Sequence, residues 1–168
     1  RMAEPEAVAE RALALLQPPA GPLASRRVLV SAGGTREPLD AVRFVGNRSS
    51  GRMGVALAAE AARRGARVTL LAANLAVPPP AGVDVVQTPT ASALAHEALA
   101  RGDADVVLMA AAVADYRPAE ELAGKRPKDG KPWRAEPVPP PAVPRELGAR
   151  RRPGQVPVAF GAGQGAGG

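Results

Sequence analysis

Short apolar segments alternate with helical segments between residues 27 and 112, and this alternation constrains the fold more than any other feature. Helices are predicted from Ser50 to Arg64 and from Ala91 to Arg101, the second one capped by Thr90. Strands that alternate with helices in this way form a parallel sheet. We therefore expect an α/β fold: a Rossmann-like, doubly wound, mostly parallel sheet with helices on both faces. Four apolar segments are the predicted strands: Arg27–Ala32, Arg67–Ala72, Val83–Gln87 and Asp105–Ala112.

Proline and glycine divide the rest of the chain. Residues 1–22 contain a helical pattern, Glu4–Leu16, followed by a Pro/Gly-rich stretch that is typical of a linker. Residues 23–168 then form the main domain, with a flexible Pro/Lys/Arg-rich loop at about 117–145. The end, Gly161–Gly168, is of low complexity, and its composition predicts no packed element.

The composition excludes several kinds of site. Among the 168 residues there are no cysteines and one histidine, and aromatic residues make up 2%. Disulfides, a thiol nucleophile and Cys- or His-cluster metal sites are therefore excluded, and base-stacking platforms for nucleic acid are not expected. No apolar run approaches the roughly 20 residues that a membrane span requires, and the charged start is not a signal peptide. We expect a cytoplasmic protein that binds neither membranes nor nucleic acid.

Most of the net charge of +6 lies in one segment: residues 117–152 hold ten basic and five acidic residues. A basic segment without nucleic-acid motifs suggests a polyphosphate or an acidic small molecule as ligand. The alternative is a solvated loop whose charge aids solubility. Lys125 lies in this segment, in a loop that is suited to closing over phosphates.

Three stretches that follow predicted strands carry residues suited to ligand binding. Gly33-Gly34-Thr35 follows the first strand, and residues 47–54 (NRSSGRMG) place hydroxyl groups and glycines at a helix start. Free N–H groups there bind phosphate, and the alternative is that Ser49 or Ser50 only caps the helix. Residues 110–116 (AAAVADY) end a buried strand and include Asp115, which is placed to bind a hydroxyl or a metal or, alternatively, to cap a turn.

Together these stretches resemble the phosphopantothenoylcysteine synthetases, which form the synthetase half of a bacterial bifunctional coenzyme A biosynthesis protein. The matching segments are SAGGTREPLDAVRFVGNRSSGRMG, AARRGA, RVTLLA and AAAVADYRP, followed by Lys125. The resemblance covers about Arg27 to Lys128. It implies that residues 1–22 are the interdomain helix and linker that follow a flavin-dependent decarboxylase domain, and that 23–168 are a ligase domain, incomplete at its C-terminal end.

The resemblance also implies an activity. Members of this family join 4′-phosphopantothenate to L-cysteine, using CTP and Mg²⁺ in bacteria, through an acyl-cytidylate intermediate, and they are homodimers. By position, Asn47 and Lys125 would be catalytic, and Arg43 would reach the substrate of a neighbouring subunit. Ala111, Ala112 and Asp115 would contact the substrate with Asn47. The nucleotide would be bound by Gly33, Ser49, Gly51, Gly54, Asp115, Lys125 and Phe160. The metal ligands are not assigned.

The chain also departs from the family pattern. Pro127 interrupts the usual run of lysines after Lys125, and the stretch aligned with a conserved Asp-containing turn reads Pro140-Pro141-Ala142-Val143. A non-catalytic nucleotide-binding or dimerisation module is therefore one alternative. A nicotinamide-dependent oxidoreductase is another, although the chain lacks G-x-G-x-x-G and no acid ends the strand at Leu71-Ala72-Ala73-Asn74.

Overall fold

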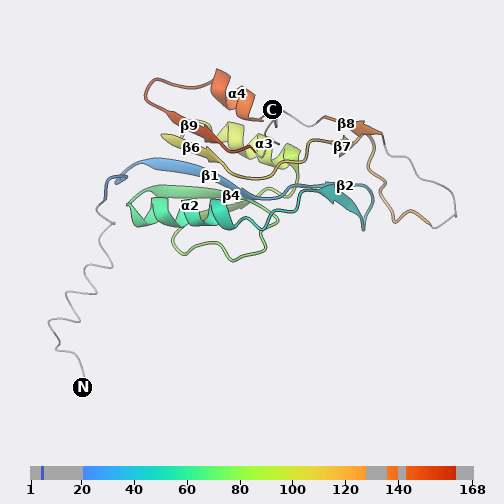
Figure 1. The fold of residues 1–168 in the computed structure, drawn as a ribbon, viewed down its shortest axis with the longest axis horizontal. Coiled ribbons are helices and arrows are strands. Elements are labelled where there is room, and N and C mark those ends of the chain that lie inside the picture. The colour runs from blue at the N-terminus through green and yellow to red at the C-terminus, as the bar shows by residue number, and fades with distance from the viewer. Residues whose placement is uncertain (1–4, 6–20, 128–135, 140–142, 162–168) are drawn as a thin grey trace, which may run out of the picture.

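The computed structural model describes Pro5 and residues 21–127, 136–139 and 143–161. The predicted helix Glu4–Leu16 and the tail after Gly161 lie outside the described residues, apart from Pro5, which is helical. Within the described part, the chain forms one central sheet with helices on both faces and two small strand pairs beside it (Figure 1).

The central sheet is parallel throughout, with the order β5-β4-β1-β6-β9. From β1 in its centre, the chain first adds strands on one side and then crosses to add strands on the other. This is the doubly wound order, and the predicted α/β fold class is confirmed. Its strands are β1 (Arg27–Gly33), β4 (Arg67–Ala73), β5 (Asp84–Gln87), β6 (Val106–Met109) and β9 (Val156–Ala159).

Alternate residues of the strands bury two separate cores. On one face, Val28 and Val30 of β1 pack with Ala58 of helix α2 (Arg52–Arg63). On the other, Leu29 packs with Leu94 of α3 (Ala91–Ala100) in the core that also includes α4 (Val143–Ala149). Each fully buried Leu or Val contributes roughly 1.5–3 kcal/mol. No helix that the structure describes is long and apolar enough to cross a bilayer.

The two long helices begin differently. Thr90 caps α3 as predicted, because its Oγ1 accepts a hydrogen bond from the N–H of Ala93 at 3.2 Å. Helix α2 has Gly51 as its N-cap, with φ of 80°, and no side chain caps it. The alternative in which Ser49 or Ser50 caps this helix is therefore wrong.

Several short elements lie in segments where the sequence analysis predicts neither a strand nor a helix. Strands of two or three residues carry no hydrophobic period, so the pattern does not reveal them. Edge strand β9 contains Pro157, which a strand tolerates when only one side is paired. These elements are β2 (Arg36–Pro38) paired with β3 (Phe44–Gly46), β7 (Arg117–Pro118) paired with β8 (Pro137–Val138), and the later α4 and β9.

Candidate functional site

The strand order reverses between β1 and β6, and the two strands end side by side. Beyond β6, the N–H of Ala112 donates to the carbonyl of Gly33 at 2.7 Å, and Thr35 N–H donates to Ala112 O at 3.1 Å. In open α/β sheets, ligands bind at the carboxyl ends of the strands where the order reverses. The structure thus brings the predicted site residues Gly33, Ala111 and Ala112 to this edge.

Two of the predicted nucleotide-binding glycines lie at close backbone approaches. A Cβ on Gly33, whose φ is +91°, would lie 2.0 Å from the carbonyl oxygen of Ala73. A Cβ on Gly54 would lie 2.4 Å from the Cβ of Ala32 and 2.8 Å from Ser31 O. These glycines therefore let β4 and α2 pack tightly against β1, which brings the start of α2 to the reversal point. A role for them in nucleotide binding stays a prediction.

The start of α2 is suited to an anion. It has no side-chain cap, and Gly51, its N-cap residue, packs against Gly33 at the end of β1. The first N–H groups of a helix lack intrahelical acceptors, and the helix dipole favours negative charge at this end. Ser49, half-buried, precedes this helix start by two residues.

Asn47 contacts the segments that follow both central strands, β1 and β6. Its Nδ2 donates to the carbonyl of Val113 at 2.9 Å. Its own carbonyl oxygen lies so close to Gly34 that a Cβ there would be 2.6 Å away. The side chain is exposed and retains one amide hydrogen and Oδ1 for a ligand.

Three further predicted residues have exposed side chains in segments that follow strands. The N–H of Phe160 donates to Met109 O at 3.1 Å, which places Phe160 at the carboxyl end of β9. Asp115 follows Ala114, whose N–H donates to Thr35 Oγ1 at 2.9 Å. Lys125 lies in the exposed segment after β7.

Arg43 contacts a buried carboxylate that the sequence analysis did not identify. Asp40 accepts hydrogen bonds from the N–H groups of Val42 at 2.8 Å, Arg43 at 2.7 Å and Arg126 at 3.3 Å. The guanidinium of Arg43 lies 3.3 Å from Asp40 Oδ2. The hydrogen bond from Val42, followed by those from Arg43 and Arg126, lowers the pKa of Asp40 below its ordinary value. An acid three residues before a predicted binding arginine is the signal that could have identified it.

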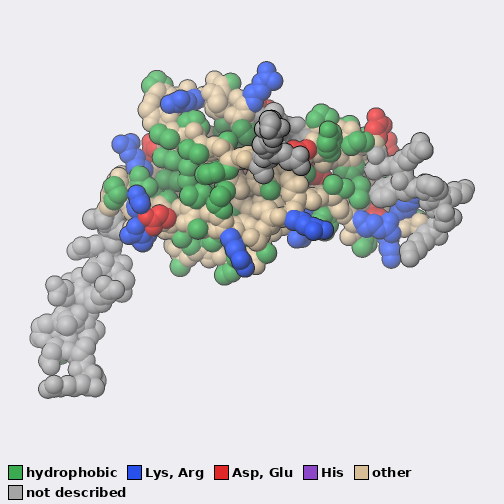
Figure 2. Space-filling model, viewed as in Figure 1, with side chains coloured by type: hydrophobic (Ala, Val, Ile, Leu, Met, Phe, Trp, Pro, Cys, Tyr) green, Lys and Arg blue, Asp and Glu red, His purple; other side chains and the backbone are tan. Residues whose placement is uncertain are grey.

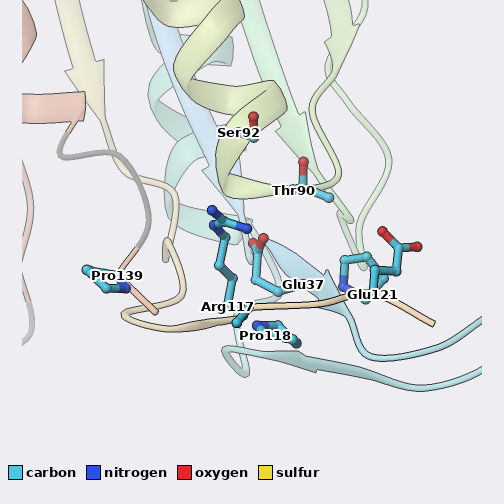
Figure 3. Close-up of a pocket in the computed structure, with 9 residues that line it drawn as sticks. Glu37, Thr90, Ser92, Arg117, Pro118, Glu121 and Pro139 are labelled. Atoms are coloured by element: carbon cyan, nitrogen blue, oxygen red, sulfur yellow. The ribbon is translucent and has the colours of Figure 1, made fainter. Parts of the chain in front are cut away.

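A pocket of about 520 Å³ opens between β2, β7 and the start of α3 (Figure 3). Glu37 and Arg117 line it, and the sequence analysis identified neither as a site residue. Glu37 is 3% exposed, and its Oε1 accepts a hydrogen bond from the N–H of Ala91 at 2.8 Å. The residues that line the pocket are Glu37, Pro38, Thr90, Ser92, Arg117, Pro118, Ala119, Glu121 and Pro139.

On the face of the molecule that Figure 2 shows, no single charged patch dominates. Figure 2 shows Lys and Arg side chains scattered over the visible face. Within the described ranges, no three His, Cys, Asp or Glu side chains gather as a metal site. No ligands for a metal ion are assigned among these residues.

The doubly wound sheet, the glycine contacts at its reversal point and the uncapped helix start define a doubly wound α/β domain, a class of protein whose ligands bind at the carboxyl ends of the strands. Residues 23–166 match the family described as the DNA/pantothenate metabolism flavoprotein C-terminal domain. The chain belongs to this family, which confirms the resemblance found in the sequence.

Curated relatives agree with this assignment. The chain is 55% identical over 105 residues to the coenzyme A biosynthesis bifunctional protein CoaBC of Mycobacterium tuberculosis, which covers 61% of this chain and 25% of that protein. Identity to CoaBC of Escherichia coli is 43% over 122 residues, covering 71% of the chain and 29% of that protein. The chain thus spans about a quarter of the length of these relatives.

Solved structures share the fold. The crystal structure of the C-terminal domain of CoaBC matches with a TM-score of 0.69 and 34% identity, over 80% of this chain and 63% of that one. A Cab2 variant in complex with phosphopantothenate-cysteine matches with a TM-score of 0.56 and 18% identity, over 82% of this chain and 62% of that one.

Proposed function

We propose that this chain is the ligase part of a coenzyme A biosynthesis protein and joins 4′-phosphopantothenate to L-cysteine at the expense of CTP. Family membership and the CoaBC relatives support the pathway. The phosphopantothenate-cysteine bound by the Cab2 variant supports the product. The observation on which the proposal depends most is Asn47, held at the reversal point of the sheet by its 2.9 Å hydrogen bond to Val113.

The proposed reaction has two steps. The carboxylate of 4′-phosphopantothenate attacks the α-phosphate of CTP, so that pyrophosphate leaves and an acyl-cytidylate forms. The amine of L-cysteine then attacks the acyl carbon, forming the amide and releasing CMP. Both nucleophiles belong to substrates, so the protein's task is to orient them and neutralise charge. This agrees with a chain that contains no cysteine.

We assign the residue roles from the family resemblance, and the positions of the residues in the fold support them. Asn47 would donate its free amide hydrogen to the substrate carboxylate and then to the acyl-cytidylate. The start of α2, with Ser49, would receive nucleotide phosphates, and Phe160 would lie near the base. The ammonium of Lys125 would neutralise the departing pyrophosphate. Ala111, Ala112 and Asp115 would contact the substrate. Mg²⁺ would enter as the magnesium complex of CTP, because Mg²⁺ binds readily to phosphate oxygens.

We further infer a homodimer that uses the β2–β3 hairpin. Three hydrophobic residues there are exposed: Val42 at 62%, Phe44 at 52% and Val45 at 46%. Contiguous exposed apolar side chains mark interaction surfaces. Arg43 lies among them, which agrees with its proposed contact with the substrate of a neighbouring subunit.

The test is pyrophosphate release from CTP with 4′-phosphopantothenate and Mg²⁺, without L-cysteine. We expect release that requires phosphopantothenate and falls at least tenfold in Asn47→Ala and Lys125→Ala. The control is Arg67→Gln, an exposed charge at the opposite end of the sheet, which should leave the rate unchanged. CTP binding without any pyrophosphate release would contradict the ligase and favour a binding module.

A further inference from the structure

We propose that the pocket between β2, β7 and the start of α3 binds the amino-acid substrate, with Arg117 holding its carboxylate and Glu37 its amine. This inference rests on the proposed ligase function and assigns the second substrate to a separate set of residues.

Glu37 and Arg117 are both available to a ligand. Only Oε1 of Glu37 is used, by the N–H of Ala91, and no described residue donates to Oε2. The Arg117 guanidinium forms no hydrogen bond or ion pair within the described part of the chain. Figure 3 shows both side chains reaching toward the first turn of α3, where the hydroxyls of Thr90 and Ser92 lie.

The chemistry of this lining fits an α-amino acid. A guanidinium binds a carboxylate with two parallel hydrogen bonds, and a buried carboxylate oxygen accepts strongly from an ammonium group. The charged lining residues are Glu37, Arg117 and Glu121, with a net charge of −1. A triphosphate would be repelled by this lining, whereas a zwitterion finds an opposite charge for each of its ends.

Two residues that line the pocket lie a short distance along the chain or across a strand pair from residues proposed to hold the acyl group. Glu37 pairs with Val45, two residues before Asn47. Arg117 follows Asp115 by two residues. Two residues of extended chain span roughly 7 Å, so this spacing supports a bound amino acid near the activated carboxylate.

Two variants and two amines test the assignment. Cysteamine has the amine and thiol of L-cysteine but no carboxylate. Arg117→Gln should raise KM for L-cysteine about tenfold or more and leave KM for cysteamine within about twofold. Glu37→Gln, whose amide oxygen can still cap Ala91, should raise KM for both amines. Pyrophosphate release without any amine should stay at the wild-type rate in both variants, as in Arg67→Gln.

The outcomes separate the two proposals. An unchanged KM for L-cysteine in Arg117→Gln, or an equal rise in KM for both amines, would contradict the binding of L-cysteine in this pocket. It would not contradict the proposed ligase function. If the wild-type chain releases no pyrophosphate, the proposed ligase function is contradicted. Saturation-transfer NMR with L-cysteine then tests whether the pocket binds the amino acid. Binding to the wild type that both variants lose supports it, and absence of binding to the wild type overturns it.

Discussion

The carboxylate of Asp40 accepts a hydrogen bond at 3.3 Å from the N–H of Arg126, 86 residues further along the chain. The guanidinium of Arg43 completes the contact by donating to the carbonyl of Arg126 at 3.5 Å. The family resemblance predicts both Arg43 and Lys125 as site residues. Asp40 joins the turn that carries the first to the segment that carries the second.

Replacing Asp40 with Asn should release the Lys125 segment. Asn retains one side-chain oxygen, but its NH₂ group replaces the other. This NH₂ group would face backbone N–H groups that donate hydrogen bonds to the carboxylate in the wild type. We expect pyrophosphate release at saturating CTP to fall about tenfold, because catalysis depends on placing the cation at the leaving group. Limited trypsin digestion after Lys125 should become faster, whereas the Arg126–Pro127 bond resists trypsin in both proteins.

The matched control is Asp84→Asn, at the exposed start of β5. It should leave both the rate and the digestion unchanged. An Asp40→Asn variant with normal turnover and normal digestion would contradict the coupling between the two segments.

The same carboxylate predicts how stability depends on pH. Hydrogen bonding, chiefly from the N–H of Val42, lowers the pKa of Asp40 from its ordinary value of 3.8. Its ionised form therefore stabilises the folded state above pH 3.8, and this contribution is lost as the pH falls through the lower, folded pKa. The difference in Tm between wild type and Asp40→Asn should be constant near pH 7 and shrink below about pH 4. A difference that persists unchanged at pH 2 would exclude this carboxylate as its source.

Gly54→Ala should disturb the packing that brings α2 to the site. The added Cβ would meet Ala32 Cβ at 2.4 Å and Ser31 O at 2.8 Å, and neither atom belongs to a flexible side chain. We expect a loss of about 1–3 kcal/mol in the free energy of unfolding, measured by urea denaturation. Gly148→Ala is the control, since nothing lies within 4 Å of its Cβ. In helix α4 it should be neutral or stabilising by about 0.5–1 kcal/mol. Equal effects of both substitutions would contradict the packing role.

The sequence predicts the central sheet well because its strands are buried on two faces and its helices have clear ends. Four of the five parallel strands were expected, and Thr90 caps α3 as the pattern indicates. The fourth predicted strand is shorter, since β6 ends at Met109, although Ala110 and Ala112 still donate to β1.

The rest depends on contacts between segments that are distant in the chain. Asp40 and Glu37 read as ordinary acids of a loop, and only the approach of Arg126 and Ala91 makes them buried acceptors. The close approach of Gly54 to Ala32 is likewise visible only when α2 is packed on β1. A motif in a single sequence identifies a residue such as Gly54 as important. It does not show whether that residue is needed for packing or for ligand binding.

The exposed apolar residues of the β2–β3 hairpin predict a dimer interface there, and a charged residue introduced into the hairpin should weaken that dimer. Val42 is 62% exposed in the turn, and only its backbone N–H is used, so Val42→Asp adds a charge without disturbing the Asp40 contacts. Burying an unpaired carboxylate in an apolar interface is unfavourable, and we expect the dimer dissociation constant to rise at least tenfold, measured by sedimentation velocity. Val156→Asp, at a 50% exposed position of the β9 edge, is the control and should leave the constant unchanged. A wild-type chain that stays monomeric would contradict the dimer. A dimer weakened by Val156→Asp instead would place the interface at β9 rather than at the hairpin. Either result would remove the proposed role of Arg43 in the neighbouring subunit.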